Sequence, residues 1–141
     1  MRILAIDLGT KRIGLALSDP LGLTAQSLPT LMRAHSEADF EYLKRLISAK
    51  KIEKCVVGLP LRLSGEIGPA AKETLEWVEI FKTKISLEVT TWDERLTTRE
   101  ATRLMIQQDL SRKKRKEKAD ELAAILILQG YLEFNRPRPQ C

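Results

Sequence analysis

RILAIDLGTKRIGLAL, residues 2–17, contains two apolar runs separated by a polar turn. The first run, Ile3–Ile6, predicts a buried strand that ends on the carboxylate of Asp7. The second run, Ile13–Leu17, predicts its antiparallel partner in a hairpin that turns at Gly9. Because burying an unpaired carboxylate costs several kcal/mol, Asp7 needs a cation, a hydrogen-bond network or access to solvent.

Three more strands are predicted after this hairpin. Residues 23–32 can supply the third strand, and Pro29 indicates an edge position or a break because proline cannot donate a ladder hydrogen bond. Two short apolar runs, 54–58 and 86–92, supply the fourth and fifth strands. A helical pattern precedes each of these two strands, which implies parallel pairing through right-handed crossovers.

Apolar residues at helical spacing occupy the segments between and after these strands. Ser36 with Asp39, and Thr97 with Glu100, are typical of capping boxes that open a helix. The predicted fold class is α/β, with a mixed five-stranded sheet of three antiparallel strands followed by two parallel strands. We expect helices at 36–47, 71–81, 97–105 and 119–134.

The composition is that of a soluble globular protein. Of the 141 residues, 43% are hydrophobic and 30% are charged, so we expect a single domain over 1–135 and a frayed tail at 136–141. No apolar run could span a bilayer and the N-terminus lacks a signal-peptide pattern, which indicates a cytoplasmic protein without a membrane partner. Cys55 and Cys141 are not expected to form a disulfide. The net charge of +5 favours a polyanionic partner.

Acidic residues at the ends of predicted elements are the candidate site residues. Asp7 ends the first strand, and either Asp93 or Glu94 points inward after the fifth, since side chains alternate along a strand. Asp120 lies near the start of the last helix, on the face that also carries Ala124 and should pack inward. Ligands of such sheets bind at the carboxyl ends of strands, so these acids should gather at one edge.

Three converging carboxylates form a hard-oxygen site suited to Mg²⁺ or Mn²⁺. The single histidine, His35, excludes a His-rich zinc site. Phosphodiester hydrolysis places extra negative charge on phosphate oxygens, which divalent ions stabilise while activating water. Each acid alone also fits a structural role, such as capping a turn or the first turn of a helix. Their coincidence in one arrangement favours a metal site.

Four motifs follow one another along nearly the whole chain: DLGTKRIGLA at 7–16, VGLPL at 57–61 with Gly65, WDERLTT at 92–98, and KADELAA at 118–124 with ILQ at 127–129. Together they resemble the YqgF family, whose members are described as Holliday junction resolvases or pre-16S rRNA nucleases. The first motif alone also resembles the phosphate loop of actin-like ATPases and sugar kinases. Those proteins need two lobes of this kind, and 141 residues supply one.

The resemblance implies an RNase H-like three-layer fold, with catalytic and metal-holding acids at Asp7, Glu94 and Asp120. It also favours Glu94 over Asp93. One residue departs from the family pattern, because Arg62 stands where a polar uncharged residue such as asparagine is frequent. The departure concerns the loop 58–68, which can be a mobile lid or only a long connection.

Basic residues are concentrated just before Asp120. Six of the seven residues 112–118 are Lys or Arg, and this run can be a solvated linker or can attract phosphates over the site by counterion release. Because only 5% of residues are aromatic, we expect recognition through phosphates and shape rather than base stacking. The candidate nucleic-acid-binding residues are Arg12, Arg62, Arg95, Arg99, Arg112, Lys113, Lys114, Arg115, Lys116 and Lys118.

Three functions fit these observations. The favoured function, which depends on the family resemblance, is a metal-dependent nuclease for structured RNA in 5′-end processing of pre-16S rRNA. A Holliday junction resolvase would use the same acids on four-way DNA junctions and would act as a dimer. A non-catalytic RNA-binding assembly module would bind RNA without cleaving it. The residues alone leave open RNA or DNA, endonuclease or exonuclease, one metal or two, and monomer or homodimer.

Overall fold

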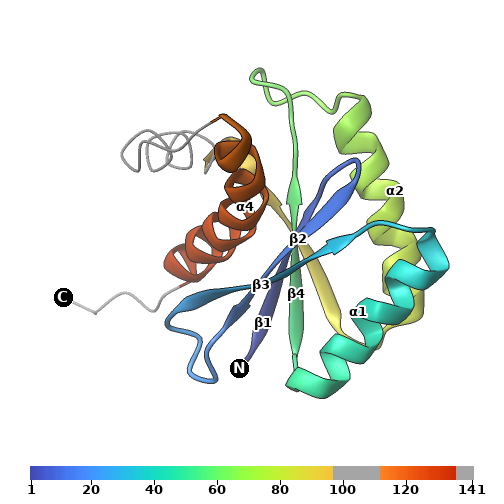
Figure 1. The fold of residues 1–141 in the computed structure, drawn as a ribbon, viewed down its shortest axis with the longest axis vertical. Helices are drawn as coiled ribbons and strands as arrows, with labels where there is room; N and C mark the ends of the chain where they lie inside the picture. The colour runs from blue at the N-terminus through green and yellow to red at the C-terminus, as the bar shows by residue number, and fades with distance from the viewer. Residues whose placement is uncertain (97–111, 136–141) are drawn as a thin grey trace.

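A mixed five-stranded sheet forms the centre of the protein in a computed structural model, which describes the backbone of residues 1–96 and 112–135 and the side chains of 1–95 and 122–135 (Figure 1). The strand order is β3-β2-β1-β4-β5. β1 pairs with β2 and β2 with β3 in antiparallel fashion, whereas β4 and β5 continue the sheet in parallel with β1. The predicted fold class is therefore confirmed. The strands are β1 (Ile3–Leu8), β2 (Arg12–Ser18), β3 (Ala25–Met32), β4 (Lys54–Leu59) and β5 (Glu88–Asp93).

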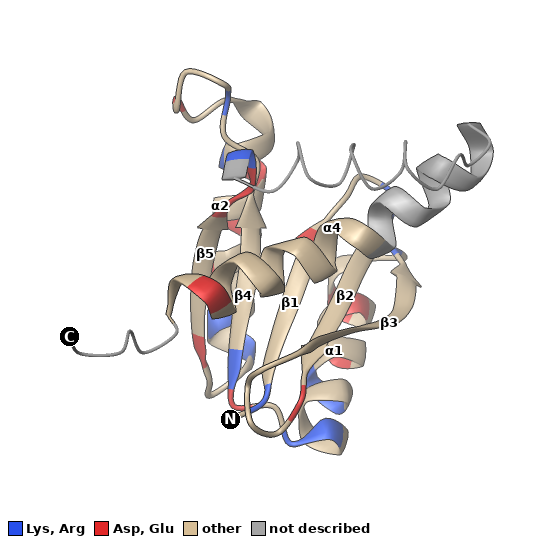
Figure 2. Cartoon of the chain, turned by 90° about the vertical axis from the view of Figure 1, so that its left-hand side faces the viewer, with Lys and Arg blue, Asp and Glu red and all other residues tan. Residues whose placement is uncertain are grey.

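Helices cover both faces of the sheet. α1 (Ser36–Lys50) and α2 (Pro69–Lys84) lie on one face, and α4 (Arg112–Phe134) crosses the other (Figures 1 and 2). Strand alternation divides the core accordingly: Leu4 and Ile6 pack with α1 and α2, whereas Ile3 and Ala5 pack with α4. Each fully buried large apolar side chain contributes about 1.5–3 kcal/mol to the free energy of unfolding, which holds the three layers together.

The proline-containing third strand is an edge strand, as the sequence predicts. Among the described residues β3 pairs only with β2, and its register with β2 is irregular between Ile13 and Leu15. Pro29 lies in this edge strand, where a missing N–H costs little because the strand pairs on one side within the described part of the chain. β1 and β4 are neighbours in the interior of the sheet, so the carboxyl ends of these two parallel strands lie side by side.

The N-terminus of α1 differs from the predicted capping box. The N-cap is His35, whose extended backbone precedes the helix and whose Nδ1 accepts a hydrogen bond from the Ala38 N–H at 3.3 Å. Ser36 is already helical, so Asp39 lies one position too deep to complete a box with it. Instead, Asp39 Oδ1 accepts from the Ala34 N–H at 3.1 Å.

The last helix begins earlier than the sequence pattern predicts. α4 starts at Arg112 rather than Ala119, so the backbone of the basic run 112–118 is part of this helix and not a linker. The predicted helix at 97–105 and the tail 136–141 lie outside the described residues. In the portion of the chain that is described, no helix has the length and apolar character needed to cross a membrane.

Candidate active site

Two predicted site residues, Asp7 and Glu94, meet with Gly58 at the carboxyl end of the sheet, on the face that α4 covers. Asp7 is next to last in β1, Gly58 is next to last in β4, and Glu94 directly follows β5. Side chains two positions earlier on each strand lie in the α4-side core, which assigns all three positions to that face. Those earlier residues are Ala5, Val56 and Trp92.

Glu94 reaches Asp7 across an intervening strand. β4 separates β5 from β1, so the backbones of the two acids are two strand spacings apart, roughly 10 Å. Their side chains nevertheless share a hydrogen bond. Gly58 lies in β4 between them, where an added Cβ would overlap Glu94 Oε1 and stand 2.5 Å from Ile127 Cδ1. The absence of a side chain at Gly58 therefore provides the space in which the two acids meet.

Burial and proximity change the protonation of Glu94. Burial, the hydrogen bond with Asp7, and the nearby charges of Asp7 and Asp93 together raise the pKa of Glu94 to about 9. The Asp7–Glu94 pair therefore retains one proton at neutral pH. A bound cation could replace this proton, since two close carboxylates are then both stabilised in the ionised form.

Asp93 has a different environment from its neighbour. Arg95 Nη2 donates to Asp93 Oδ2 at 2.7 Å and Arg95 Nε contacts both oxygens of the same carboxylate. These hydrogen bonds lower the pKa of Asp93. Of the two adjacent acids, Glu94 thus faces Asp7, while Asp93 forms an ion pair with Arg95.

The other predicted site residues lie on β2, on the loop after β4 and on α4, and some of their side chains are outside the described residues. Arg12 is the first residue of β2, and Arg62 lies in the loop after β4 with its side chain against Gly68 at the start of α2. The backbone of Asp120 lies in α4 one turn before Ala124, which is buried against the sheet. The side chain of Asp120, those of 112–118, and all of Arg99 lie outside the described residues.

The donor set at this site fits a hard divalent cation. Asp7 and Glu94 offer carboxylate oxygens and share a proton that a cation could replace. Among the described side chains, no group of three His, Cys, Asp or Glu residues could hold a metal ion. The side chain of the third predicted ligand, Asp120, lies outside the described residues. The fit therefore rests on two acids, with Asp120 as a predicted third.

The free energy of unfolding of the cation-free protein is expected to fall as pH rises from about 4.5 to about 9. In this window folded Glu94 holds a proton that unfolded Glu94 has released, so the unfolded state binds fewer protons and rising pH favours it. Thermal denaturation in the presence of a chelator, followed across this pH range, measures the effect. Glu94→Gln should remove most of this pH dependence, and an unchanged slope in that variant would contradict the assignment.

Sequence reasoning missed the role of Gly58 and the ion pair of Arg95. A glycine inside an otherwise apolar strand often marks a close approach, and this signal was present in KCVVGL. The pairing of Asp93 with Arg95 has no comparable pattern in the sequence, because it depends on how the chain turns into the short 3-10 helix Glu94–Leu96.

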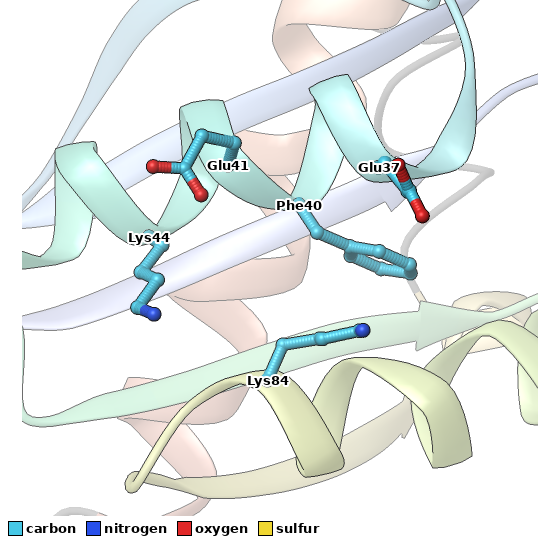
Figure 3. Close-up of a pocket in the computed structure, with 5 residues that line it drawn as sticks. All are labelled: Glu37, Phe40, Glu41, Lys44 and Lys84. Carbon is cyan, nitrogen blue, oxygen red and sulfur yellow. The ribbon is translucent and has the colours of Figure 1, made fainter.

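Two hollows elsewhere on the surface lie away from the acids. A groove of about 240 Å³ between α1 and α2 is on the face opposite α4 (Figure 3). A second hollow of about 320 Å³ lies near the opposite end of β1 and β4, beside Met1 and Lys54. The first groove is lined by Glu37, Phe40, Glu41, Lys44 and Lys84.

Comparison with solved structures agrees with the fold. Thermus thermophilus RuvC in complex with a Holliday junction substrate is 17% identical with a TM-score of 0.61, and the similarity covers 99% of both chains. The fowlpox virus resolvase bound to Holliday junction DNA is 14% identical with a TM-score of 0.58, covering 97% of this chain and 100% of the resolvase. The expected RNase H-like architecture is thereby confirmed.

Comparison with sequences is more specific. A protein of Clostridium botulinum strain Hall, named "Putative pre-16S rRNA nuclease", is 45% identical over 133 residues, which cover 94% of this chain and 97% of that protein. The protein of the same name from strain Alaska E43 is 47% identical over the same coverage. Residues 1–134 match the family described as RuvX, Holliday junction resolvase. The chain therefore belongs to the RuvX family of nucleases, the same family as the YqgF proteins that its four motifs resemble.

Proposed function

We propose that the protein is a metal-dependent nuclease that hydrolyses phosphodiester bonds of RNA in the cytoplasm, at the 5′ end of pre-16S rRNA. The observation that carries this proposal is the Asp7–Glu94 pair, two acids from separate strands joined over Gly58 at the end of the sheet. The names of relatives at 45–47% identity support the choice of pre-16S rRNA. The net charge of +5 suits a polyanionic substrate.

In this proposal Asp7 and Glu94, with Asp120, hold Mg²⁺ or Mn²⁺. The bound cation supplies stabilisation of negative charge on phosphoryl oxygens and lowers the pKa of water. Asp7 and Glu94 release their shared proton when both become ionised ligands, so loading is favoured at higher pH. Gly58 keeps the space between β1 and β5 open, so the two carboxylates meet without moving their strands.

A side-by-side cleavage assay tests the proposal. Wild-type protein is offered a 5′ precursor fragment of 16S rRNA and a synthetic four-way DNA junction, each with Mg²⁺, with Mn²⁺ and with chelator. We expect metal-dependent cleavage of the RNA that is absent in Asp7→Asn. If Asp7→Asn cleaves as fast as wild type in preparations free of contaminating nuclease, the assigned site is wrong.

The family description favours one second candidate, a Holliday junction resolvase. In the same assay, paired nicks at symmetric positions of the junction with the RNA left intact would support it. A resolvase should also bind the junction as a dimer, since two sites must act on two strands. Binding of RNA without product at any metal concentration would instead support the non-catalytic module.

A further inference from the structure

The loop between β4 and α2, residues 60–68, projects beyond the carboxyl end of the sheet (Figures 1 and 2). Its tip is a tight turn: the Gly65 N–H donates to Arg62 O at 2.7 Å, and the Arg62 N–H donates to Glu66 O at 3.0 Å. Gly65 has φ +90, which a residue with a side chain rarely adopts. The backbone of this turn is therefore closed by its own hydrogen bonds.

Arg95 anchors this turn beside the candidate active site. Its Nη1 donates to Leu63 O at 3.3 Å while the rest of the guanidinium is held by Asp93. The guanidinium also packs on Gly65, where an added Cβ would stand 3.2 Å from Nη1. Because Arg95 directly follows Glu94, the turn is fixed to the same short segment that carries one of the two acids.

Leu63 occupies the tip of this anchored turn. Its side chain is 95% exposed, the highest value among the large apolar residues of the described part of the chain. A single exposed leucine is ordinary in proteins. Here, however, the backbone carbonyl of the leucine accepts a hydrogen bond from Arg95, so the exposed side chain stands on a turn that is attached to the residue directly after Glu94.

The charge around Leu63 favours a base over a phosphate. The turn carries one basic and one acidic side chain, Arg62 and Glu66, and the charge of Arg95 is balanced by Asp93. Because these charges cancel, the turn would attract a phosphate only weakly. An apolar side chain can instead pack on the uncharged face of a nucleobase. Aliphatic side chains serve in this way when they enter between base steps or against unstacked bases.

We propose that Leu63 is a fixed apolar wedge that packs against an unpaired or unstacked nucleobase beside the cleaved phosphodiester, held in place by Arg95. The inference builds on the proposed nuclease function and adds the substrate class, which is nucleic acid with unpaired nucleotides next to the cleavage site. Arg95 is then a positioning residue for Leu63.

The test measures binding rather than cleavage, in the Asp7→Asn background with Mg²⁺. Two RNA probes contain the same strand. In the first probe this strand is fully paired. In the second probe some of its nucleotides are left unpaired, and these include 2-aminopurine as a fluorescent base. Leu63→Ala should weaken binding of the unpaired probe by about tenfold, which is the scale of one leucine side chain losing its burial, and should abolish the fluorescence change. Affinity for the paired probe should change less than about twofold, well below that loss.

The matched control is Leu21→Ala. Leu21 is also highly exposed, at 77%, but lies in the turn between β2 and β3 at the opposite end of the sheet. This variant should bind both probes as the parent does. Arg95→Lys, which keeps the charge and loses the planar fork, should reduce the fluorescence change in the same direction as Leu63→Ala.

Equal affinity of the parent and Leu63→Ala for the unpaired probe would overturn the wedge and leave the nuclease proposal standing. A similar loss on the paired probe would also overturn it, since the leucine would then not discriminate unpaired bases. Failure of both the wild-type protein and the Asp7→Asn parent to bind either RNA would overturn both proposals.

Discussion

Glu94→Asp is expected to lose cleavage almost as completely as Glu94→Gln, with each variant slower than wild type by about 10³-fold, the upper range for removing one electrostatic group from an active site. The aspartate keeps the charge but is one methylene shorter. Because β4 lies between β5 and β1, the shorter carboxylate cannot span the distance to Asp7. Single-turnover cleavage at saturating Mg²⁺ measures the loss.

Glu88→Asp is the matched control for this shortening. Glu88 begins the same strand, β5, and its exposed carboxylate lies 3.6 Å from Lys54 Nζ at the far end of the sheet. Its shortening should leave the cleavage rate unchanged, because an exposed ion pair contributes little. A Glu94→Asp variant that retains most of the wild-type rate would show that Glu94 acts without bridging to Asp7, and would contradict the geometry proposed for the site.

Gly58→Ala should reduce the cleavage rate by about 10²-fold, the effect expected when reacting groups are displaced by about 1 Å. The new methyl group would occupy the space of Glu94 Oε1 and press on Ile127 Cδ1. Glu94 would have to move away from Asp7, and the Ile127 side chain of α4 would have to shift. We also expect a loss of about 1–3 kcal/mol in the free energy of unfolding from overpacking.

Gly130→Ala separates these two effects. It adds a methyl group of the same size to α4, where its Cβ would stand 3.1 Å from the Trp92 ring and away from Glu94. The better helix propensity of alanine offsets part of the crowding. The rate should stay near that of wild type. If both glycine variants lose the same fraction of the rate, packing of α4 in general, and not the space over Gly58, limits cleavage.

Local sequence patterns predicted the elements well because their causes are local. Alternating and continuous apolar runs fix which strands are buried, and Pro29 indicates an edge. The predicted N-cap of α1, Ser36, was wrong by one residue, because the nitrogen of His35 can accept the same hydrogen bond as a serine hydroxyl. The predicted start of α4 was wrong because it was placed where the apolar pattern begins. The basic run before it lacks an apolar face but has good helix propensity, so the helix includes it.

The candidate site was only partly predictable, because its geometry depends on the lateral order of the strands. That Glu94 approaches Asp7 follows from β5 and β1 flanking β4, and no local pattern specifies this order. The space at Gly58 exists only in that arrangement. Arg95, which is predicted to bind nucleic acid, lies against Asp93 and Leu63 in the structure, and its contact with a substrate stays a prediction.

The division of the core by the sheet also separates the two tryptophans of the chain. Trp77 of α2 packs on Phe40 of α1 and on Phe81, whereas Trp92 packs edge-on against Tyr131 of α4. Each face of the sheet therefore contains its own intrinsic fluorophore. In a variant that keeps only Trp92, two residues before Glu94, the tryptophan emission reports the docking of α4 beside the acids, and in a variant that keeps only Trp77 it reports the opposite layer.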